Sequence, residues 1–502
     1  MALAPAAGRL LLMVSARRLC RRSDPESADH LPEDLHPVLR RVYRARQLLD
    51  TDDLDLSLAR LIPPDRLRDM ALATDLLEKT LRDGRRILIV ADFDADGATS
   101  CALAVRALRA MGAGHVDFLV PNRFEYGYGL TPEIVELARP RAPQLLITVD
   151  NGISSVEGVA AARAAGMQVL ITDHHLPGER LPQADVIVNP NQHGDSFPSK
   201  ALAGVGVIFY VLTALRARLR ENGWFSQKGI PEPNLAELLD LVALGTVADV
   251  VPLDHNNRIL VSQGLARIRA GKCVPGIRAL LRVAGREPAR ITATDLGFLV
   301  APRLNAAGRL ADMSLGIACL LSDSDSEAEG IARQLDQLNR ERRQIEADMQ
   351  KTAMTAVERL HLADSGLPPG LCLFDEGWHQ GVIGLVAARV KERTHRPVIA
   401  FAPAGENEIK GSARSVPGLH IRDALDNMAA RYPDLLQKFG GHAMAAGLTL
   451  ARDRFDHFRT AFEDEVGRWL SEDDLQGRLL TDGELTREDF SLELAELLRA
   501  AG

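Results

Sequence analysis

Three acidic residues alternate in the segment ADFDADG: Asp92, Asp94 and Asp96. They follow the apolar run ILIV, so their carboxylates come where a buried strand is expected to end. Carboxylate oxygens are the ligands that hard divalent cations such as Mg²⁺ and Mn²⁺ prefer. The spacing also matches the opening of an EF-hand loop, but position twelve of that loop would be Leu103, where a bidentate glutamate is required. One aspartate here would be explained as a helix N-cap, whereas three indicate a metal site.

Further candidate ligands follow other apolar segments. Asp150 ends the run LLITV, although its Asp-Asn-Gly context is equally typical of a turn. Asp173, His174 and His175 follow QVLIT, and an acid beside imidazoles could supply a metal ligand and its hydrogen-bonding partner. Asp249 lies in the apolar stretch ALGTVADVVPL, where a charge is costly unless it is paired or bound to a metal. Imidazole among carboxylates favours Mn²⁺ and similar ions.

These candidate ligands must be positioned by strands that alternate with helices. Between residues 86 and 190, short apolar runs alternate with helical stretches of about 10–15 residues, which predicts βαβ units and a mostly parallel sheet. Ligands of such sheets bind beyond the carboxyl ends of the strands. Since three of the acidic segments follow such runs, we expect their side chains to meet at one edge of the sheet.

The whole chain is predicted to be an α/β protein with more than one domain, because 502 residues exceed one ordinary core. Apolar residues at helical spacing, with no glycine or proline after Gly330, predict a long helix in the middle of the chain. The last segment begins like a strand and is too short to close a core of its own, so the C-terminal end is expected to be an incomplete domain. The expected segments are an N-terminal extension with short helices at 1–80, a mostly parallel α/β domain at 81–324, a connecting helix at 325–362, a smaller α/β domain at 363–462 and the start of an incomplete domain at 463–502.

Composition and charge limit the class of protein. A formal net charge of −8 argues against a chain that coats nucleic acid through bulk electrostatics, but not against an enzyme that acts on it. The five cysteines form no CxxC pair, which disfavours a disulfide framework or a cysteine-rich zinc site and favours a reducing compartment. The N-terminal run LLLMV is too short for a signal peptide or a membrane span. We therefore expect a cytoplasmic protein without a membrane partner.

The motifs resemble the DHH phosphoesterase superfamily, in which DFDADG, TVDNG, TDHH and GTVAD occur in this order. The resemblance is closer to the single-strand-specific 5′-to-3′ exonucleases of that superfamily, and it extends from about residue 35 to the last residue. It is carried by PNRFEYGYGL at 121–130, APRLNAAGRL at 301–310, EGWHQGVIG at 376–384, KGSARS at 410–415 and GGHAMAAG at 440–447. It implies a DHH catalytic domain at 81–324 and a DHHA1 substrate domain at 363–462. It also implies a C-terminal OB-fold. The segment LLTDGEL at 479–485 resembles the opening of that domain.

The resemblance further implies two divalent ions, Mn²⁺ or Mg²⁺, in a two-metal mechanism. One ion would be held by Asp96, Asp150, His174 and Asp249. Asp94 would contribute to the second ion, with Asp150 bridging the two. His175 would donate a hydrogen bond to the scissile phosphate, and with Asp94 and Asp96 it completes the predicted catalytic residues. Asp92 is a weaker candidate ligand, and the resemblance does not distinguish metal binding from a supporting role for it.

Selection of the substrate is expected from a second group of residues. The residues predicted to bind the strand are Arg123, Arg303, Asn305, Arg309, Ser412, Arg414 and His442. Arginine suits phosphate because its guanidinium is planar, although Arg123 taken alone could be an ordinary surface residue. Ser412 and Arg414 resemble the family's pocket for a 5′-terminal phosphate, and His442 would point into a cleft between the two domains.

Two weaker candidates for substrate contact lie in the segment EGWHQGVIG. Trp378 or His379 could stack on a base, but packing explains Trp378 equally well. The glycine-rich GGHAMAAG could cradle a phosphate through backbone N–H groups, or it could reflect close packing alone.

The predicted function is a 5′-to-3′ exonuclease that hydrolyses single-stranded DNA to mononucleotides in recombination and repair. Its expected partners are a strand with a 5′-phosphate end, a single-strand-binding protein and a helicase. The alternative is a phosphodiesterase of short oligonucleotides or cyclic dinucleotides. An inactive DNA-binding relative would have lost metal ligands, whereas every expected ligand is present here. A family-II pyrophosphatase fits poorly because Val90 stands where that family places a histidine.

Overall fold

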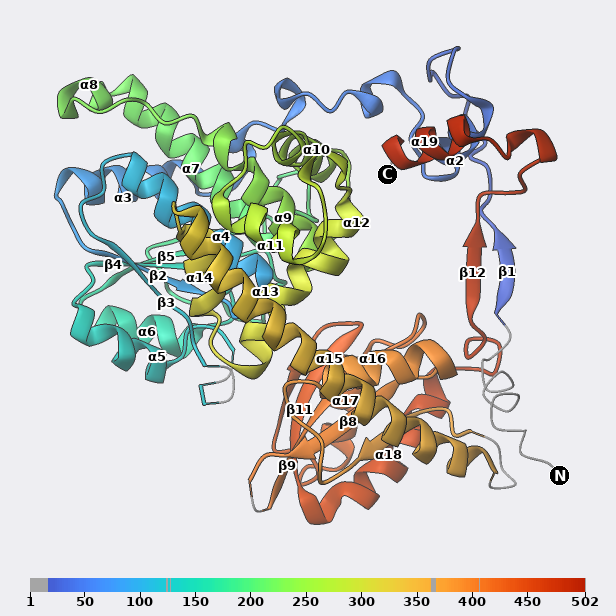
Figure 1. Cartoon of the computed structure of the whole chain (residues 1–502). Coiled ribbons are helices and arrows are strands. Elements are labelled where there is room, and N and C mark those ends of the chain that lie inside the picture. The colour runs from blue at the N-terminus through green and yellow to red at the C-terminus, as the bar shows by residue number, and fades with distance from the viewer. Residues whose placement is uncertain (1–16, 123–124, 127, 363–366, 406, 502) are drawn as a thin grey trace. The chain divides into compact units, whose positions relative to one another are not determined.

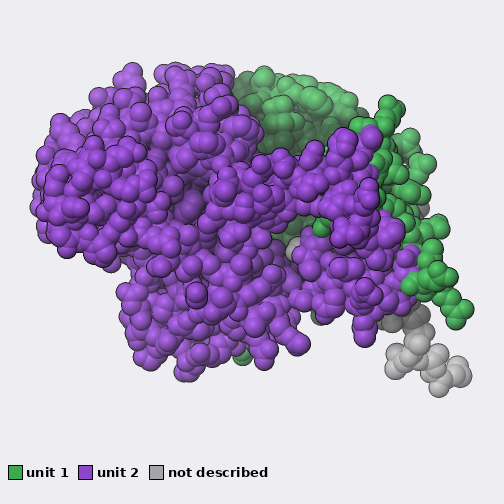
Figure 2. Space-filling view, turned by 90° about the horizontal axis from the view of Figure 1, so that it is seen from above, with its two compact units in different colours: residues 1–27, 40–47, 340–488 green, residues 28–39, 48–339, 489–502 purple. Residues whose placement is uncertain are grey.

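The computed structural model describes residues 17–122, 125–126, 128–362, 367–405 and 407–501. The chain divides into two compact units, which are coloured separately in Figure 2. The large unit comprises residues 28–39, 48–339 and 489–502. The small unit comprises residues 1–27, 40–47 and 340–488. Among the described helices, none combines the length and the hydropathy that a membrane-spanning helix requires.

The large unit is built on a five-stranded sheet of order β3-β2-β4-β5-β6, in which every neighbouring pair is parallel. The predicted mostly parallel sheet is therefore confirmed (Figure 1). Its strands are β2 Ile87–Ala91, β3 Val116–Leu119, β4 Leu145–Val149, β5 Gln168–Thr172 and β6 Val186–Val188. All residues of β2 and β4 are buried, as expected for strands covered on both faces, and this burial explains their continuous apolar sequences.

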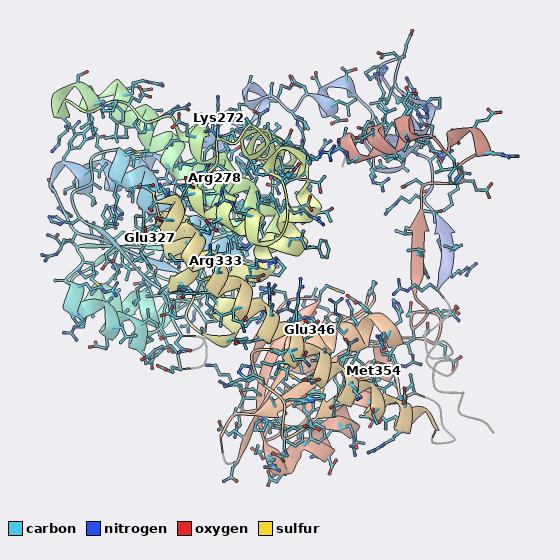
Figure 3. The ribbon with its side chains drawn as sticks, viewed as in Figure 1. Lys272, Arg278, Glu327, Arg333, Glu346 and Met354 are labelled. Atoms are coloured by element: carbon cyan, nitrogen blue, oxygen red, sulfur yellow. The ribbon has the colours of Figure 1, made fainter. Side chains whose placement is uncertain are left out.

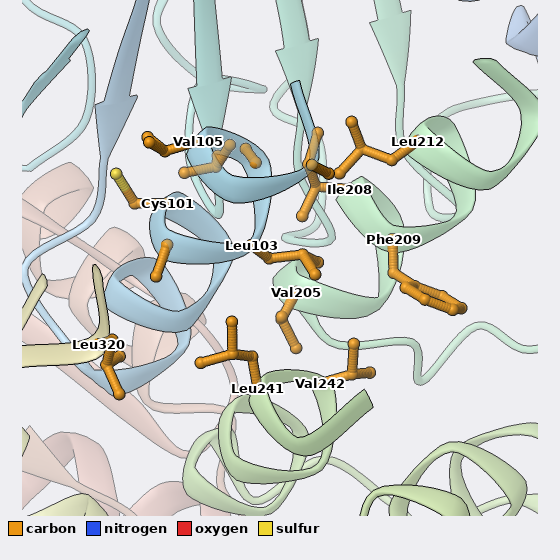
Figure 4. Close-up of a cluster of buried hydrophobic side chains, with 14 of the residues drawn as sticks. Cys101, Leu103, Val105, Val205, Ile208, Phe209, Leu212, Leu241, Val242 and Leu320 are labelled. Atoms are coloured by element: carbon orange, nitrogen blue, oxygen red, sulfur yellow. The ribbon is translucent and has the colours of Figure 1, made fainter. Parts of the chain in front are cut away.

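Helices cover both faces of this sheet. On one face, α5 and α6 pack with Val90 of β2, whereas Ile89 of the same strand belongs to the core that contains α3, α4 and α7. Figure 4 shows the centre of this core, where Leu103 of α4 lies near Val205 of α7. The helices of the large unit are α3 Met70–Arg82, α4 Ala95–Ala110, α5 Pro132–Ala138, α6 Val156–Ala164, α7 Gly204–Glu221, α8 Trp224–Lys228, α9 Leu239–Asp249, α10 His255–Arg269, α11 Pro275–Val283, α12 Ala293–Asp295, the π-helix η8 Leu296–Val300, α13 Ala301–Leu310 and α14 Ser314–Leu321.

One long helix, α15 (Asp325–Leu362), follows the helical part of the large unit. Its labelled residues Glu327, Arg333, Glu346 and Met354 mark its course in Figure 3. At its start, the Nη2 atom of Arg278 lies 2.6 Å from a carboxylate oxygen of Asp325, which anchors the first turn of α15 to α11.

The small unit is built on a mixed sheet of order β10-β11-β9-β8-β7, with β7 and β8 parallel and the other pairs antiparallel. The strands are β7 Leu371–Phe374, β8 Val398–Pro403, β9 Glu408–Arg414, β10 Lys438–Gly441 and β11 Ala445–Ala451, and the helices are α16 Ile383–Thr394, α17 Ile421–Arg431 and α18 Phe455–Trp469. The aromatic rings of Phe401, Phe458 and Phe462 fill its core.

A separate two-stranded parallel sheet joins the ends of the chain within the small unit. Its strands are β1 (Arg18–Arg21) and β12 (Arg478–Thr481). The N-terminal extension was expected to contain only short helices, and this expectation was wrong for Arg18–Arg21. The helices η2 Thr51–Leu54, η3 Leu58–Arg60, η4 Pro64–Arg66, α2 Pro37–Ala45 and α19 Leu492–Ala501 complete the terminal segments.

Glu78 links α3 to α7 in the large unit. Its buried carboxylate accepts hydrogen bonds from Arg82 Nε at 2.9 Å, Arg218 Nε at 2.6 Å and Asn222 Nδ2 at 2.9 Å. Burial alone would raise the pKa of Glu78, but these partners outweigh it and hold that pKa below its usual value. A carboxyl with a lowered pKa stabilises the fold above its unfolded pKa, and this stabilisation is lost as pH falls through the folded pKa.

We expect Glu78→Gln to reduce the free energy of unfolding by about 1–2 kcal/mol at pH 7. The deficit should shrink as the pH falls below about 4, because the wild-type carboxyl then takes up a proton as well. Urea denaturation at pH 7 and at pH 3.5 measures both values. Glu136→Gln, which alters an exposed pair with Arg139, is the control and should change little. A deficit that stayed constant with pH would contradict this account.

Candidate metal centre

The predicted ligands come from the carboxyl ends of neighbouring strands and from one helix terminus. Asp92 and Asp94 follow β2 and lead into α4, whose second residue is Asp96. Asp150 directly follows β4 and His174 follows β5 by one residue, while Asp249 is the last residue of α9. Because β2, β4 and β5 are adjacent and parallel, their carboxyl ends share one edge of the sheet.

Asp94 and Asp96 are both held by backbone N–H groups. Oδ1 of Asp94 caps α4 by accepting hydrogen bonds from the N–H of Asp96 at 2.9 Å and of Gly97 at 3.0 Å. The carboxylate of buried Asp96 accepts from the N–H of Gly204 at 2.7 Å and of Val205 at 2.9 Å, at the start of α7. A carboxylate has about four lone-pair sites, so both groups can still bind a cation. The helix-cap interpretation and the metal interpretation of this loop are therefore compatible.

Asp150 has a buried carboxylate oxygen that accepts no hydrogen bond from the described residues. Its φ of 62° lies in the left-handed region, which is uncommon outside glycine and is found where a backbone is held for function. Its Oδ1 atom is buried and accepts no hydrogen bond from any described residue, although His174 Nε2 lies only 3.1 Å away. Gly204 packs against it so closely that a Cβ atom there would be 2.5 Å from Oδ1. A buried carboxylate that is held in place by its backbone and by Gly204, and that has an unsatisfied oxygen, is suited to bind a cation.

The donor atoms form three groups, within each of which they all lie less than 4.8 Å apart. The groups are Asp96 with His174 and Asp249, Asp92 with Asp94 and Asp150, and Asp150 with His174 and His175. His174 Nε2 lies 3.1 Å from Asp150 Oδ1 and 3.4 Å from Asp249 Oδ2, so it is shared between neighbouring groups. The arrangement can hold two divalent ions, and it brings Asp92 beside Asp94 and Asp150.

The electrostatics of the cluster also favour bound cations. Burial, followed by repulsion from Asp249 and Asp94, holds the pKa of Asp96 well above its usual value. Burial and repulsion from neighbouring carboxylates also hold the pKa of Asp150 well above its usual value. The pKa of Asp249 rises to about 7 through burial and its neighbour Asp94. So many carboxylates in a buried site are costly unless cations neutralise them. The donor set of carboxylate oxygens and an imidazole nitrogen fits Mn²⁺ or Mg²⁺.

Asp173 is the hydrogen-bonding partner of the two histidines, a role that the sequence suggested for an acid beside the imidazoles. Its Oδ1 accepts hydrogen bonds from the backbone N–H of His174 at 2.7 Å and of His175 at 3.1 Å, and His175 Nδ1 lies at 2.8 Å. Its Oδ2 accepts from the N–H of Ile153 at 2.9 Å. Burial tends to raise the pKa of Asp173, but its bonds with His175 keep that pKa below its usual value. Asp173 therefore orients both histidines.

His175 is prepared to donate a hydrogen bond. Burial lowers the pKa of its imidazole, but Asp173 outweighs this effect and raises the pKa to about 9. The hydroxyl of Tyr128 lies 3.2 Å from His175 Nδ1 and donates to the backbone oxygen of Asp150 at 3.3 Å. Tyr128 belongs to the segment PNRFEYGYGL, in which sequence analysis singled out only Arg123.

Comparison with known proteins identifies the family. The DHH family, N-terminal domain, matches residues 86–246, and the DHHA1 domain matches residues 367–468. The chain is 54% identical over 490 residues to the single-stranded-DNA-specific exonuclease RecJ of Salmonella typhimurium, covering 98% of this chain and 85% of the relative. The chain belongs to the RecJ family. The resemblance inferred from the motifs is thereby confirmed.

Other members of the RecJ family are also similar to this chain in sequence and in structure. The single-stranded-DNA-specific exonuclease RecJ of Escherichia coli is 54% identical over 485 residues, which cover 97% of this chain and 84% of that protein. The structure of RecJ in complex with Mn²⁺ from Thermus thermophilus superposes with a TM-score of 0.75 at 34% identity, over 92% of this chain and 63% of that one. A structure of RecJ in complex with Mg²⁺ from the same organism gives a TM-score of 0.70. This chain spans less than two thirds of that Thermus chain.

Two residues predicted to bind phosphate in this RecJ-family chain are engaged elsewhere. Arg303 is buried in α13, with Nη2 2.8 Å and Nε 2.9 Å from Asp336 Oδ1 of α15. Asn305 Oδ1 accepts a hydrogen bond from the N–H of Ala95 at 2.8 Å, so its side chain holds the loop between β2 and α4. These contacts give both residues a supporting role in this structure, and their direct contact with phosphate stays a prediction. Arg309, one helical turn after Asn305, is half-buried on the same helix.

The predicted phosphate pocket of the small unit comes together at one end of α16. Arg414 Nη1 donates hydrogen bonds to Ser412 Oγ at 3.1 Å and to the backbone oxygen of Ala413 at 2.7 Å. A Cβ atom at Gly384, in the first turn of α16, would lie 2.8 Å from Arg414 Nη2 and 2.9 Å from Ser412 Oγ. A guanidinium and a hydroxyl thus lie at a helix N-terminus, where a phosphate is favoured.

The remaining candidates differ in exposure. His442 is exposed in the turn between β10 and β11. Trp378 is 7% exposed, so the packing interpretation holds and stacking on a base does not. His379 is half-buried, and its Nδ1 accepts a hydrogen bond from the N–H of Gly381 at 3.1 Å. Arg123 lies outside the described residues.

Proposed function

We propose that this chain is a metal-dependent 5′-to-3′ exonuclease that hydrolyses single-stranded DNA to mononucleotides in recombination and repair. The observation that carries the proposal is the buried, unsatisfied carboxylate of Asp150 between two groups of metal-binding side chains. The RecJ relatives, which are named single-stranded-DNA-specific exonucleases, support the choice of substrate.

In this proposal Asp96, Asp150, His174 and Asp249 would hold one divalent ion, and Asp94 and Asp150 would contribute to holding a second. When bound, the two metal ions would activate a water molecule and neutralise charge on the phosphoryl oxygens. Asp92 lies within reach of the second group and becomes a further candidate ligand. The backbone bonds to Asp94 and Asp96 hold these carboxylates in place before substrate arrives.

His175 acts on the scissile phosphate as a hydrogen-bond donor. Asp173 accepts from Nδ1, so the doubly protonated ring keeps its Nε2–H as a second donor, 3.4 Å from the hydroxyl of Tyr128. Tyr128 limits the rotation of this ring by its contact with Nδ1. Asp94 and Asp96, with His175, remain the proposed catalytic residues.

The choice of a 5′ end comes from the small unit. Ser412 and Arg414 bind the terminal 5′-phosphate at the N-terminus of α16. Arg123, Arg309 and His442 are proposed to contact the strand. An enzyme that takes only single strands needs unwound DNA, which supports a helicase and a single-strand-binding protein as partners. All five cysteines are free thiols, which supports a reducing, cytoplasmic location.

The decisive experiment follows the products from a 5′-phosphorylated single strand of about twenty nucleotides in Mn²⁺ or Mg²⁺. We expect mononucleotides from the first turnover and slower cutting of a 5′-hydroxyl strand. Arg414→Ala should reduce the preference for the 5′-phosphate about tenfold or more, because a charge-assisted bond to phosphate is lost. The matched control is Arg359→Ala on the exposed face of α15, which should keep the preference.

Two results would reject the proposal. A long strand that survives while dinucleotides are cut would instead indicate a phosphodiesterase of short oligonucleotides. Release of products from the 3′ end would contradict the direction and the role of Ser412 and Arg414 together.

A further inference from the structure

A second cationic pocket lies in the small unit, at the opposite end of α16 from Ser412 and Arg414. It is a pocket of about 160 Å³ whose lining includes Arg17, Lys391, Arg393, His395 and Arg478. These residues come from three segments of the chain: the residue before β1, the C-terminal end of α16 and the first residue of β12. The family comparisons and the proposed metal centre leave this pocket without a role.

The positive charges of this pocket are not neutralised by ion pairs. Among the described residues, no carboxylate forms an ion pair with Arg17, Lys391, Arg393 or Arg478. The one acidic residue of the lining, Glu392, pairs with Arg389 at 3.2 Å, and its backbone oxygen accepts from Arg17.

Two further acids face the pocket's surroundings. Asp474 attracts Arg478 but accepts its hydrogen bonds from Ser471, and Glu472 attracts Arg396. Neither acid forms an ion pair with a cation of the pocket within the described part of the chain. The pocket therefore keeps a local excess of positive charge in a chain whose net charge is −8.

The register of the terminal sheet adds to this excess. Arg18 of β1 lies directly opposite Arg478 of β12, and both side chains are exposed. Like charges directly opposite each other destabilise a strand pair, and an anion beside them would reduce this repulsion. Attraction to the helix dipole explains Lys391 and Arg393 in the last turn of α16, but not the arginines of β1 and β12.

The pKa of His395 reflects the same repulsion between positive charges. Its backbone has a φ of 50° at the C-cap of α16, and its ring is half-buried in the pocket. Burial lowers the pKa of His395 first, and the positive charges of Lys391, Arg17 and Arg396 lower it further. A bound anion would relieve this repulsion.

We propose that this pocket, lined by Arg17, Lys391, Arg393 and Arg478, binds a backbone phosphate of the single strand some nucleotides away from its 5′ end. The inference rests on the proposed function, since it assumes that the 5′-phosphate binds at Ser412 and Arg414. Gly384 and Arg393 are nine residues apart on α16, which corresponds to about 14 Å along the helix. The rise per nucleotide of one strand of stacked B-DNA is 3.4 Å, so a stacked strand takes roughly four nucleotides for this distance and an extended single strand about two to three.

The salt dependence of binding tests this pocket. We measure the affinity of the full chain for 3′-labelled, 5′-phosphorylated (dT)20 and (dT)2 in EDTA, so that neither strand is cut. For (dT)20, Lys391→Ala/Arg393→Ala should make the slope of log K against log salt shallower by about 0.7, because the pocket binds one phosphate and each single-strand phosphate contact contributes about 0.7. Binding of (dT)2 should be unchanged, since it is too short to reach the pocket.

Lys351→Ala/Arg359→Ala removes the same charge from the exposed face of α15 and should leave both slopes unchanged. Arg478→Glu is a second variant, on β12 in place of α16, and should also weaken binding of (dT)20 relative to wild type. Equal slopes for wild type and both pocket variants would overturn the proposal, as would an equal loss for (dT)2. Hydrolysis of (dT)20 in Mn²⁺ is measured separately: if the wild type fails to cut it, the proposed function fails, while the slopes still report on the pocket.

Discussion

Replacing Asp150 with asparagine is expected to lower the rate of single-strand hydrolysis about a thousandfold, and to raise the melting temperature of the metal-free protein. Asparagine has nearly the same shape and tolerates the left-handed backbone that Asp150 adopts, so the fold should be retained. The substitution removes one charge from a buried group whose pKa is raised by burial and by Asp96 and Asp94. Without metal, that charge destabilises the fold, whereas with metal it is needed as a ligand.

The two effects are separated by measuring melting curves and hydrolysis with and without Mn²⁺. In EDTA we expect Asp150→Asn to melt about 2–4 °C above wild type. Mn²⁺ should stabilise the wild type by mass action and the variant much less. Asp117→Asn on exposed β3 is the control, since it removes a carboxylate that pairs with an exposed arginine. Equal stabilisation by Mn²⁺ in Asp150→Asn and wild type would show that the ions bind elsewhere.

The edge of the sheet could be predicted from sequence because it follows from local patterns. Apolar runs of strand length fixed where β2, β4 and β5 end, and parallel pairing brings the residues after them together. Asp94, Asp150 and His174 were found in this way. The long helix α15 was equally visible, because its apolar spacing continues without an interrupting glycine or proline after Gly330.

Other features depend on contacts that no local pattern reports. The strand β1 forms only because β12 pairs with it more than four hundred residues later, so its own sequence gave no signal. Asp173 was visible beside His174, but its role depends on the direction of its hydrogen bonds. Tyr128 could have been noticed as a polar aromatic residue in PNRFEYGYGL, a motif that already carried the family resemblance.

Arg303 shows why residue type alone does not assign a role. An arginine in a motif shared with nucleases suggests phosphate, yet here the guanidinium is buried against Asp336, thirty-three residues later in sequence. The pair joins α13 to α15, and the adjacent Asn305 joins α13 to the loop that carries Asp94. The position of the metal-binding loop therefore depends on α13, and α13 depends on this ion pair.

We expect Arg303→Ala to reduce the stability of the large unit by about 3 kcal/mol, because it removes the guanidinium that neutralises a buried carboxylate. The side chains of Arg303 and Asp336 are 9% and 11% exposed, so solvent screens their interaction little. Urea denaturation measures the loss. Arg333→Ala breaks a pair with Glu329 in which the arginine is 69% exposed, and it should cost less than about 0.5 kcal/mol.

The double variant Arg303→Leu/Asp336→Leu separates a structural role from contact with substrate. Replacing both partners by apolar side chains leaves no buried charge behind, so most of the stability should return. If Arg303 acts only by holding α13, hydrolysis and the preference for a 5′-phosphate should recover together with stability. If the double variant folds but remains inactive on 5′-phosphorylated strands, Arg303 must leave Asp336 and contact the phosphate during turnover, and its assignment to support would be wrong.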